Sequence, residues 1–170
     1  MQISCHGAAR GVTGSCHLLD CAGRLLLVDC GMFQGSRDLE EENSEAFGFD
    51  PAAVDFLLLT HAHLDHCGRL PLLVRRGFRG EIIATAATRE LAQIVLQDSA
   101  HMAEDDAAWR SRRARGRPVT PLYTQADVSA AMQRFGRAAV YGQALELAGG
   151  LRVSFHDAGH ILGSAHVLVQ

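Results

Sequence analysis

The chain of 170 residues is long enough for one domain with a hydrophobic core. Hydrophobic residues make up 48% of it and charged residues 21%, a balance that is typical of globular proteins and excludes a disordered chain. The net charge of −3 argues against strong overall attraction to nucleic acid or to an anionic membrane, and no apolar run approaches the ~20 residues of a membrane helix.

The five cysteines are odd in number, form no C-x-x-C pair and follow no secretory signal. These features predict free thiols in a reducing compartment, and therefore a cytoplasmic protein without a membrane segment. Cys67 adjoins the histidine-rich loop described below, and we interpret it as a small buried residue rather than as a ligand.

The N-terminal part of the chain has a β pattern. Residues 1–6 predict a short strand, and residues 16–20 and 25–29 predict a hairpin that turns around residues 22–23. Residues 7–15 form a glycine-rich loop, which lacks the Gly-Lys-Ser/Thr sequence of a phosphate-binding loop.

Asp29 closes the apolar run of residues 25–28. A carboxylate at the tip of a buried strand is costly unless it is partnered. We therefore expect Asp29 to accept hydrogen bonds from the backbone or the imidazoles of the histidine-rich loop, and so to orient metal ligands. The alternative, which we favour less, is an ordinary strand-ending aspartate before a turn.

Residues 36–50 carry several carboxylates, and we interpret this acidic stretch as a solvated helix or loop face. Its charge would repel an anionic substrate, so we expect it to lie away from any substrate path. Residues 54–59 then predict a buried strand. Residues 72–74, just after Pro71, predict a helix, because the first turn of a helix tolerates proline.

The histidine-rich loop, residues 60–66, joins this strand to this helix. His61 and His63 are two residues apart, so on extended backbone they point the same way and their nitrogens can close on one metal ion. Asp65 and His66 fall where the chain turns, so we expect them to point elsewhere and to suit a second ion. Two-metal hydrolytic sites need ions roughly 3.5–4 Å apart, and one compact loop can supply that spacing.

Imidazole and carboxylate together suit zinc best among the common ions, with manganese or iron as alternatives. The competing interpretation is a solvated turn that happens to be rich in histidine. The density of ligands directly after a core strand argues against it.

Residues 81–84 predict a further strand, and two strands that are each followed by a helix indicate mixed α/β layers. Residues 86–109 form the longest helical pattern, with His101 packed or exposed rather than ligating. Its apolar stripe is expected in the core and consists of Leu91, Ala92, Ile94, Val95 and Met102.

Arginines crowd the residues that follow this helical pattern, at positions 110, 112, 113, 115 and 117. One interpretation is a flexible basic arm that touches phosphates. The other is a charged helix end, where cations are favoured by the helix dipole. The sequence does not decide between them.

Thr124 and Asp127 have the spacing of a capping box, which predicts a helix from there to about residue 135. Strands are predicted near residues 138–141, 145–147 and 151–155, the last two joined by a Gly-Gly turn. Residues 156–165 then form a second loop, with two histidines between small residues that allow close approach to an ion. Residues 166–170 predict a last strand.

Four motifs in this order resemble the metallo-β-lactamase superfamily, and its β-CASP branch of RNA-processing nucleases in particular. They are Gly7-Ala8-Ala9-Arg10 with Thr13-Gly14-Ser15, Asp29-Cys30-Gly31-Met32-Phe33-Gln34-Gly35, His61-x-His63-x-Asp65-His66 with Gly68-Arg69-Leu70-Pro71, and Ala158-Gly159-His160-Ile161-Leu162-Gly163-Ser164-Ala165. The resemblance covers essentially the whole chain.

The resemblance implies an αββα sandwich with the metals at one edge. It implies that His61, His63 and His160 hold one zinc, that Asp65 and His66 belong to a second, and that Asp29 supports the loop. His156 is then a neighbour of the site or only a loop residue. The implied reaction is two-zinc hydrolysis of an RNA phosphodiester, with Asp65 as the catalytic residue that positions the attacking water and can accept its proton.

Members of the branch continue with a metal-bridging aspartate, the β-CASP insertion that covers the cleft, and a late histidine. None of these is present, so we interpret residues 1–170 as the N-terminal portion of a metallo-β-lactamase domain within a longer, RNA-cleaving protein. For these residues alone we expect one or at most two zinc ions and weak or no activity. The alternatives are a thioester or lactone hydrolase of the same fold, or a non-catalytic remnant. An edge strand at the end of the chain would need a cover, for which a homodimer is one solution.

Overall fold

The computed structural model describes residues 1–21, 23–36, 39, 41–113 and 118–170. Parts of three sequence predictions therefore lie outside the described residues. These parts are Ala22 in the first hairpin turn, Asp38 and Glu40 in the acidic stretch, and Arg115 and Arg117 in the arginine cluster.

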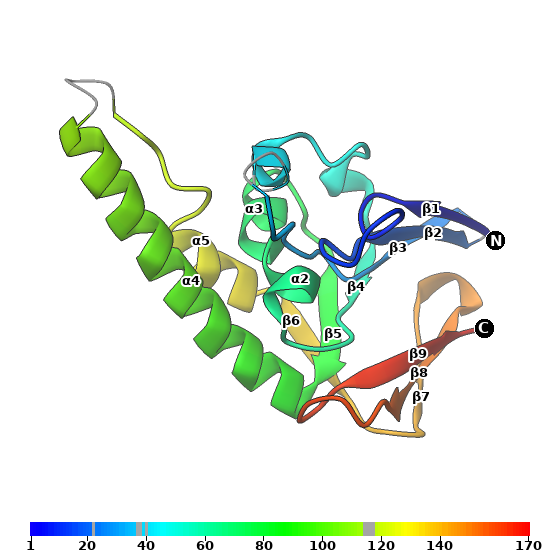
Figure 1. The fold of residues 1–170 in the computed structure, drawn as a ribbon. Helices are drawn as coiled ribbons and strands as arrows, with labels where there is room; N and C mark the ends of the chain where they lie inside the picture. The colour runs from blue at the N-terminus through cyan, green and yellow to red at the C-terminus, as the bar shows by residue number, and fades with distance from the viewer. Residues whose placement is uncertain (22, 37–38, 40, 114–117) are drawn as a thin grey trace.

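The larger of two sheets has six strands in chain order (Figure 1). The first three strands are antiparallel, and the third to sixth are parallel. The strands are β1 (Gln2–Cys5), β2 (His17–Cys21), β3 (Arg24–Val28), β4 (Phe56–Leu58), β5 (Glu81–Thr85) and β6 (Phe135–Ala139). Because β3, β4 and β5 run in parallel, their carboxyl ends meet at one edge of the sheet.

The smaller sheet has three antiparallel strands, with β8 in the centre. They are β7 (Ala144–Glu146), β8 (Arg152–Asp157) and β9 (Ala165–Val169). The predicted Gly-Gly turn between β7 and β8 is confirmed, as a short 3₁₀ helix, Ala148–Gly150, with Gly149 at φ +81°. His156 and Asp157 belong to β8, so the prediction that they lie in a loop was wrong.

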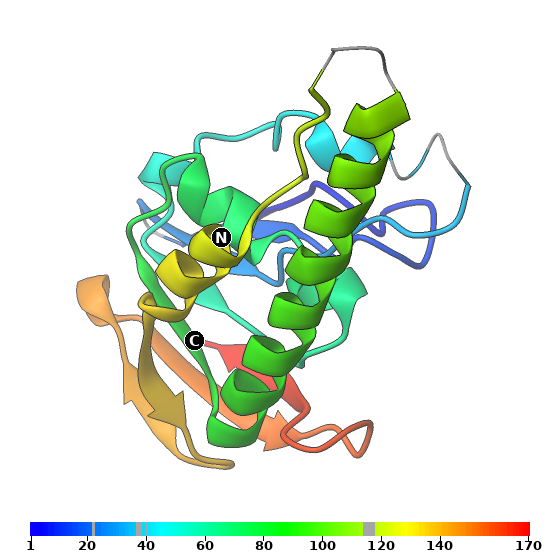
Figure 2. The same ribbon diagram turned by 90° about the vertical axis from the view of Figure 1, so that its left-hand side faces the viewer.

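The four α-helices whose bounds the structure describes lie on the face of the larger sheet that points away from the smaller one (Figures 1 and 2). They are α2 (Leu64–Cys67), α3 (Leu70–Arg75), α4 (Ala86–Arg113) and α5 (Gln125–Met132). Two 3₁₀ helices, Glu42–Ser44 and Pro51–Ala53, precede β4. The capping box of α5 is confirmed, since Thr124 and Asp127 bond each other's backbone N–H groups.

Two cores hold these layers together. One lies between the helices and the larger sheet and contains Leu57, Leu72 and Leu96. The other lies between the two sheets and contains Leu58, Ile83 and Phe155. The layers are thus helix, sheet, sheet, which confirms the predicted mixed α/β sandwich with three of its four layers among the described residues.

The apolar stripe predicted for α4 was partly wrong. Ile94 and Met102 are 62% and 63% exposed. The buried residues of α4 are instead small for the most part: Thr88, Ala92, Leu96, Ala100 and Ala107. Most are four residues apart, which places them on one side of the helix and leaves Ile94 and Met102 on the other.

The described part of the arginine cluster, Arg110, Arg112 and Arg113, lies in the last turn of α4. This agrees with the interpretation as a charged helix end. Among the described residues, none of the helices has both the length and the apolar character to cross a bilayer.

Candidate metal centre

The histidine-rich loop leaves the larger sheet at the carboxyl end of β4. The strand ends at Leu58, residues 59–63 continue without regular structure, and α2 begins at Leu64. Asp65 and His66 therefore lie in a one-turn helix rather than in a loop, so their side chains leave the extended segment that carries His61 and His63. The ring of His66 nevertheless lies close to that of His61, with centroids 3.9 Å apart, so the expected separation of the two pairs stays a prediction.

His61, His63 and His160 are brought together at this edge of the sheet. Each offers one ring nitrogen, and the three nitrogens lie within 4.8 Å of one another. Nδ1 of His63 and Nε2 of His160 are 3.2 Å apart. Two nitrogens on one tetrahedral zinc, with bonds of ~2.0–2.1 Å, are about 3.3 Å apart. The three rings therefore fit one zinc-sized ion.

His61 is also in the protonation state that a metal ligand needs. Burial and the neighbouring His66 lower its pKa to about 4, although the charge of Asp29 opposes this shift. The imidazole is therefore neutral at pH 7. Thr60 Oγ1 lies 2.9 and 3.0 Å from the two oxygens of Asp29, so its only proton goes to that carboxylate. It then accepts from Nδ1–H of His61 at 3.0 Å, which leaves Nε2 of His61 free to bind an ion.

Asp29 lies beneath this loop and is buried. It accepts hydrogen bonds from Ser15 Oγ at 3.1 Å and from the backbone N–H of Thr60 at 2.9 Å. It also accepts the hydrogen bond from the Thr60 hydroxyl described above. Nδ1 of His66 is 2.7 Å from its Oδ2. Its φ of +60° is unusual for a residue other than glycine, and aspartate and asparagine adopt it most readily. Asp29 thus contacts one histidine directly and another through Thr60.

Asp65 and His66 form a second polar group beside the three histidines. Nε2 of His66 is 3.7 Å from Oδ2 of Asp65, and the rings of His66 and His61 are 3.9 Å apart between centroids. Burial lowers the pKa of His66, but the hydrogen bond with Asp29 and the charges of Asp29 and Asp65 outweigh it, so the pKa is raised. Because Asp29 holds Nδ1, Nε2 of His66 and the Asp65 carboxylate are the groups that a second ion could use.

Two residues near the site have other roles. Nε2 of His156 lies 3.0 Å from Ser154 Oγ on β8. The side chain of His156 is exposed to solvent and does not belong to the three-histidine cluster. Cys67 is fully buried, and its thiol donates to the Ala62 carbonyl at 3.4 Å. Burial raises the pKa of this thiol well above its ordinary value. Cys67 is therefore a protonated core residue, as predicted.

Sequence reasoning missed the hydroxyl residues that hold the ligands. These are Ser15, Thr60, Thr85, Thr88 and Ser164. The one available signal was position, because Thr60 directly precedes His61 and Ser164 lies in the same motif as His160. Thr85 and Thr88 are distant in sequence and carry no motif.

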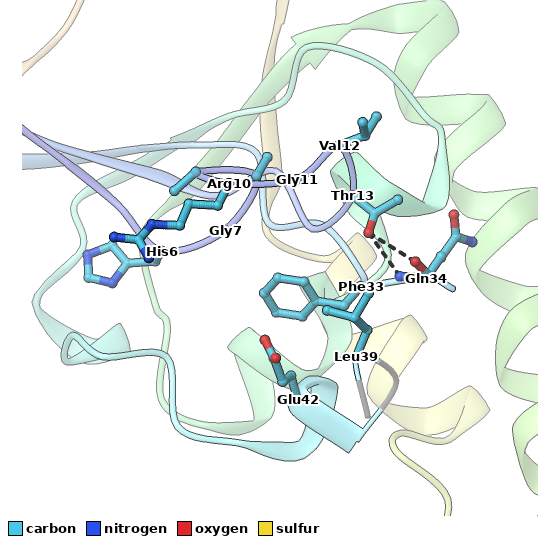
Figure 3. Close-up of a pocket in the computed structure, with 12 residues that line it drawn as sticks. His6, Gly7, Arg10, Gly11, Val12, Thr13, Phe33, Gln34, Leu39 and Glu42 are labelled. Atoms are coloured by element: carbon cyan, nitrogen blue, oxygen red, sulfur yellow. Dashed lines mark hydrogen bonds between the residues drawn. The ribbon is translucent and has the colours of Figure 1, made fainter. Parts of the chain in front are cut away.

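A cavity of about 610 Å³ lies between the glycine-rich loop and the segment after β3 (Figure 3). His6 and Arg10 line one side, and Phe33 and Glu42 line another. Thr13 Oγ1 bonds the backbone of Gln34, which ties the two segments together. Glu42 belongs to the acidic stretch, so this cavity combines both charges.

A layered sandwich whose sheet edge carries a cluster of histidines with an adjoining carboxylate defines a class of metal-binding hydrolase folds. The model of the metallo-beta-lactamase superfamily matches residues 9–161, and the chain belongs to this superfamily.

Among curated proteins, ribonuclease TTHA0252 of Thermus thermophilus is 46% identical over 170 residues, which are 100% of this chain and 35% of that protein. Transcription termination factor FttA of Methanocaldococcus jannaschii is 30% identical over 97% of this chain and 24% of its own length. Cleavage and polyadenylation specificity factor 73 of Drosophila melanogaster is 28% identical over 100% of this chain and 23% of its own length. The chain thus spans about a third or less of these relatives. The predicted resemblance to the β-CASP branch of RNA-processing nucleases is confirmed.

Solved structures agree on the fold. A metallo-beta-lactamase with an HARLDQ motif from Cronobacter sakazakii has a TM-score of 0.56 at 22% identity, covering 94% of this chain and 52% of that one. A B3 metallo-beta-lactamase with an active-site glutamic acid has a TM-score of 0.52 at 25% identity, covering 94% of this chain and 52% of that one.

Proposed function

We propose that the protein carrying this chain is a zinc-dependent hydrolase that cleaves RNA phosphodiester bonds in the cytoplasm. The single observation that carries the proposal is the three-histidine cluster with Asp65 beside it. Relatives that are named as ribonucleases support RNA as the substrate. His61, His63 and His160 would hold one zinc, and Asp65 and His66 would contribute to a second.

Zinc, when bound, supplies a Lewis acid that stabilises charge on phosphoryl oxygens and makes water more acidic. The chain's own residues supply orientation and proton transfer. Asp65 positions the attacking water and accepts its proton, because its carboxylate lies 3.7 Å from Nε2 of His66, whose ring lies against that of His61. Asp29 and Thr60 hold Nδ1 of His66 and of His61, so that Nε2 of each ring would be free to bind an ion.

Cleavage of labelled RNA by the intact protein tests this function. We expect cleavage by the wild type, loss with a chelator and recovery with zinc. Asp65→Asn should lower the rate ~100-fold or more, because the amide cannot accept the proton. His156→Ala is the matched control and should cleave normally. Thioester or lactone cleavage without RNA cleavage would contradict the substrate but not the metal site.

Bound metal per chain tests the site separately. On residues 1–170 we expect about one zinc, bound through three histidines. His61→Ala and His160→Ala should each lose it, whereas His101→Ala, on the exposed side of α4, should keep it. Zinc retained in both site variants would contradict the ligand set. The homodimer stays a prediction. It would pair through β9, an edge strand of the smaller sheet among the described residues, and sedimentation of the same sample tests it.

A further inference from the structure

His160 lies in a segment that has no regular structure of its own. Residues 158–164 connect β8 and β9, and Gly159 and Gly163 both have positive φ, +64° and +81°. Ser164 Oγ accepts from the backbone N–H groups of His160 and Ile161, at 3.1 and 3.2 Å. These bonds shape the loop but do not fix it relative to His61 and His63, which come from another segment.

Two buried threonines supply an external attachment. The hydroxyls of Thr85 and Thr88 both lie 2.8 Å from the carbonyl oxygen of Gly163 and donate to it. Thr85 is the last residue of β5, and Thr88 lies in the first turn of α4. Thr88 is 0% exposed and Thr85 7%. If the loop moved away, both buried hydroxyls would lose their carbonyl partner, so loop displacement is penalised.

The two threonines are themselves held in place. Thr85 Oγ1 accepts from the backbone N–H of Thr88 at 3.2 Å, as a helix-capping side chain does, and lies 3.0 Å from Thr88 Oγ1. The pair is thus a fixed part of the β5–α4 junction. Thr88 is the cleaner one to change, because its side chain does not cap the helix.

Gly163 is fitted to this pair. A Cβ atom at Gly163 would lie 2.6 Å from Thr85 Oγ1 and 2.7 Å from the backbone nitrogen of Thr88. Only glycine permits this approach at a φ of +81°. Farther along, the N–H of Ala165 donates to the Thr60 carbonyl at 3.0 Å, next to His61. The loop is therefore attached both to the segment after β4 that carries the other ligands and to the β5–α4 junction.

We propose that Thr88, together with Thr85, is a positioning residue that holds the His160 loop where its imidazole meets those of His61 and His63. The proposal rests on the proposed metal centre. It adds that the affinity for zinc is set partly by a hydroxyl pair at the β5–α4 junction that does not touch the ion.

Zinc affinity, measured by competition with a chromophoric chelator, tests the proposal. Thr88→Val keeps the shape but removes the hydroxyl, and it should weaken zinc binding roughly tenfold or more. Thr88→Ser should restore affinity to near the wild-type value. Ser99→Ala is the matched control, because Ser99 is also on α4 but bonds Tyr123, at 2.8 Å, and not the loop. It should leave zinc affinity unchanged.

Gly163→Ala tests the same contact from the loop side and should also weaken zinc binding. Cobalt-substituted protein gives a second readout, since the tetrahedral absorption should diminish in Thr88→Val and return in Thr88→Ser. Thermal unfolding of metal-free samples shows whether the variants are folded.

Unchanged zinc affinity in folded Thr88→Val, or a serine variant as weak as the valine one, would overturn the positioning role while leaving the metal centre intact. Wild-type protein that binds no zinc would overturn the metal centre itself, and the positioning role with it.

Discussion

Asp29 is the residue on which the polar contacts beneath the histidines converge. Its burial cost at a strand end was enough to predict from sequence that it would meet the histidine-rich loop. The Thr60 backbone N–H and the His66 imidazole are partners of the expected kinds. The hydroxyl donors were not predicted, because Ser15 is 14 residues away and Thr60 is 31, and no periodicity links hydroxyl residues at such separations. His160 was assigned only through family resemblance, since nothing local distinguishes it from His156.

Asp29→Asn should lower the free energy of unfolding by about 2 kcal/mol, because a charged acceptor of several buried hydrogen bonds is replaced by an amide. Asparagine tolerates the positive φ, so the loss of stability measures the weakened hydrogen bonds to residue 29 rather than backbone strain. Urea denaturation of the metal-free protein measures it. Asp20→Asn, at an exposed position, is the control and should change stability by less than ~0.5 kcal/mol. Equal stability of both variants would contradict the role of Asp29.

Among the elements, α4 and the β5–β6 pair show what periodicity can and cannot predict. The length of α4 was predictable, whereas its buried side was not. The helix packs through small residues such as Ala92 and Ala100, which a search for large apolar side chains passes over. The β5–β6 pair carries a polar bridge that no pattern indicated. Glu81 accepts from the backbone N–H of Arg137 at 2.7 Å and from its guanidinium at 2.6–3.2 Å.

This bridge predicts a pH dependence. The hydrogen bond with Arg137 lowers the pKa of Glu81 below its ordinary value, although partial burial opposes it. A carboxyl group whose folded-state pKa is lowered contributes stability above its unfolded pKa, near 4.5, and loses it as the pH falls further. Glu81→Gln should therefore be less stable than wild type at pH 7, and this difference should shrink below about pH 4.5. Thermal unfolding of both proteins between about pH 3.5 and about pH 7 measures this difference in stability. A difference that does not vary with pH would contradict the assignment.

At the scale of the whole molecule, the central strands of the larger sheet, β4 and β5, are buried on both faces by two separate cores. The run of residues 54–59 has no alternation, because successive side chains of β4 enter different cores. Leu57 faces the helices and Leu58 the smaller sheet. Sequence alone therefore predicted a buried strand but not which residue meets which layer. The arrangement of layers came from the resemblance, and the solved structures agree with it.

Leu57→Ala and Leu58→Ala should each lower the free energy of unfolding by about 3 kcal/mol, because both side chains are fully buried. Ile94→Ala, on the exposed side of α4, should cost less than ~0.5 kcal/mol. Urea denaturation compares the three. A small loss at Leu58 with a large one at Leu57 would mean that the smaller sheet does not pack as described.

His63 and His160 are 97 residues apart in the chain, yet their ring nitrogens are 3.2 Å apart. An ion held by both would close the intervening chain into a ring, as a disulfide does. It would thereby cross-link the loop of the smaller sheet to the edge of the larger one. Cross-links over long loops restrict the unfolded chain most, and binding to the folded state alone adds to stability in proportion to the logarithm of free metal. Chelation should then speed digestion by a protease that cuts unfolded chain. If the proposed centre binds its ion, the supply of that metal would then affect how long these residues survive proteolysis.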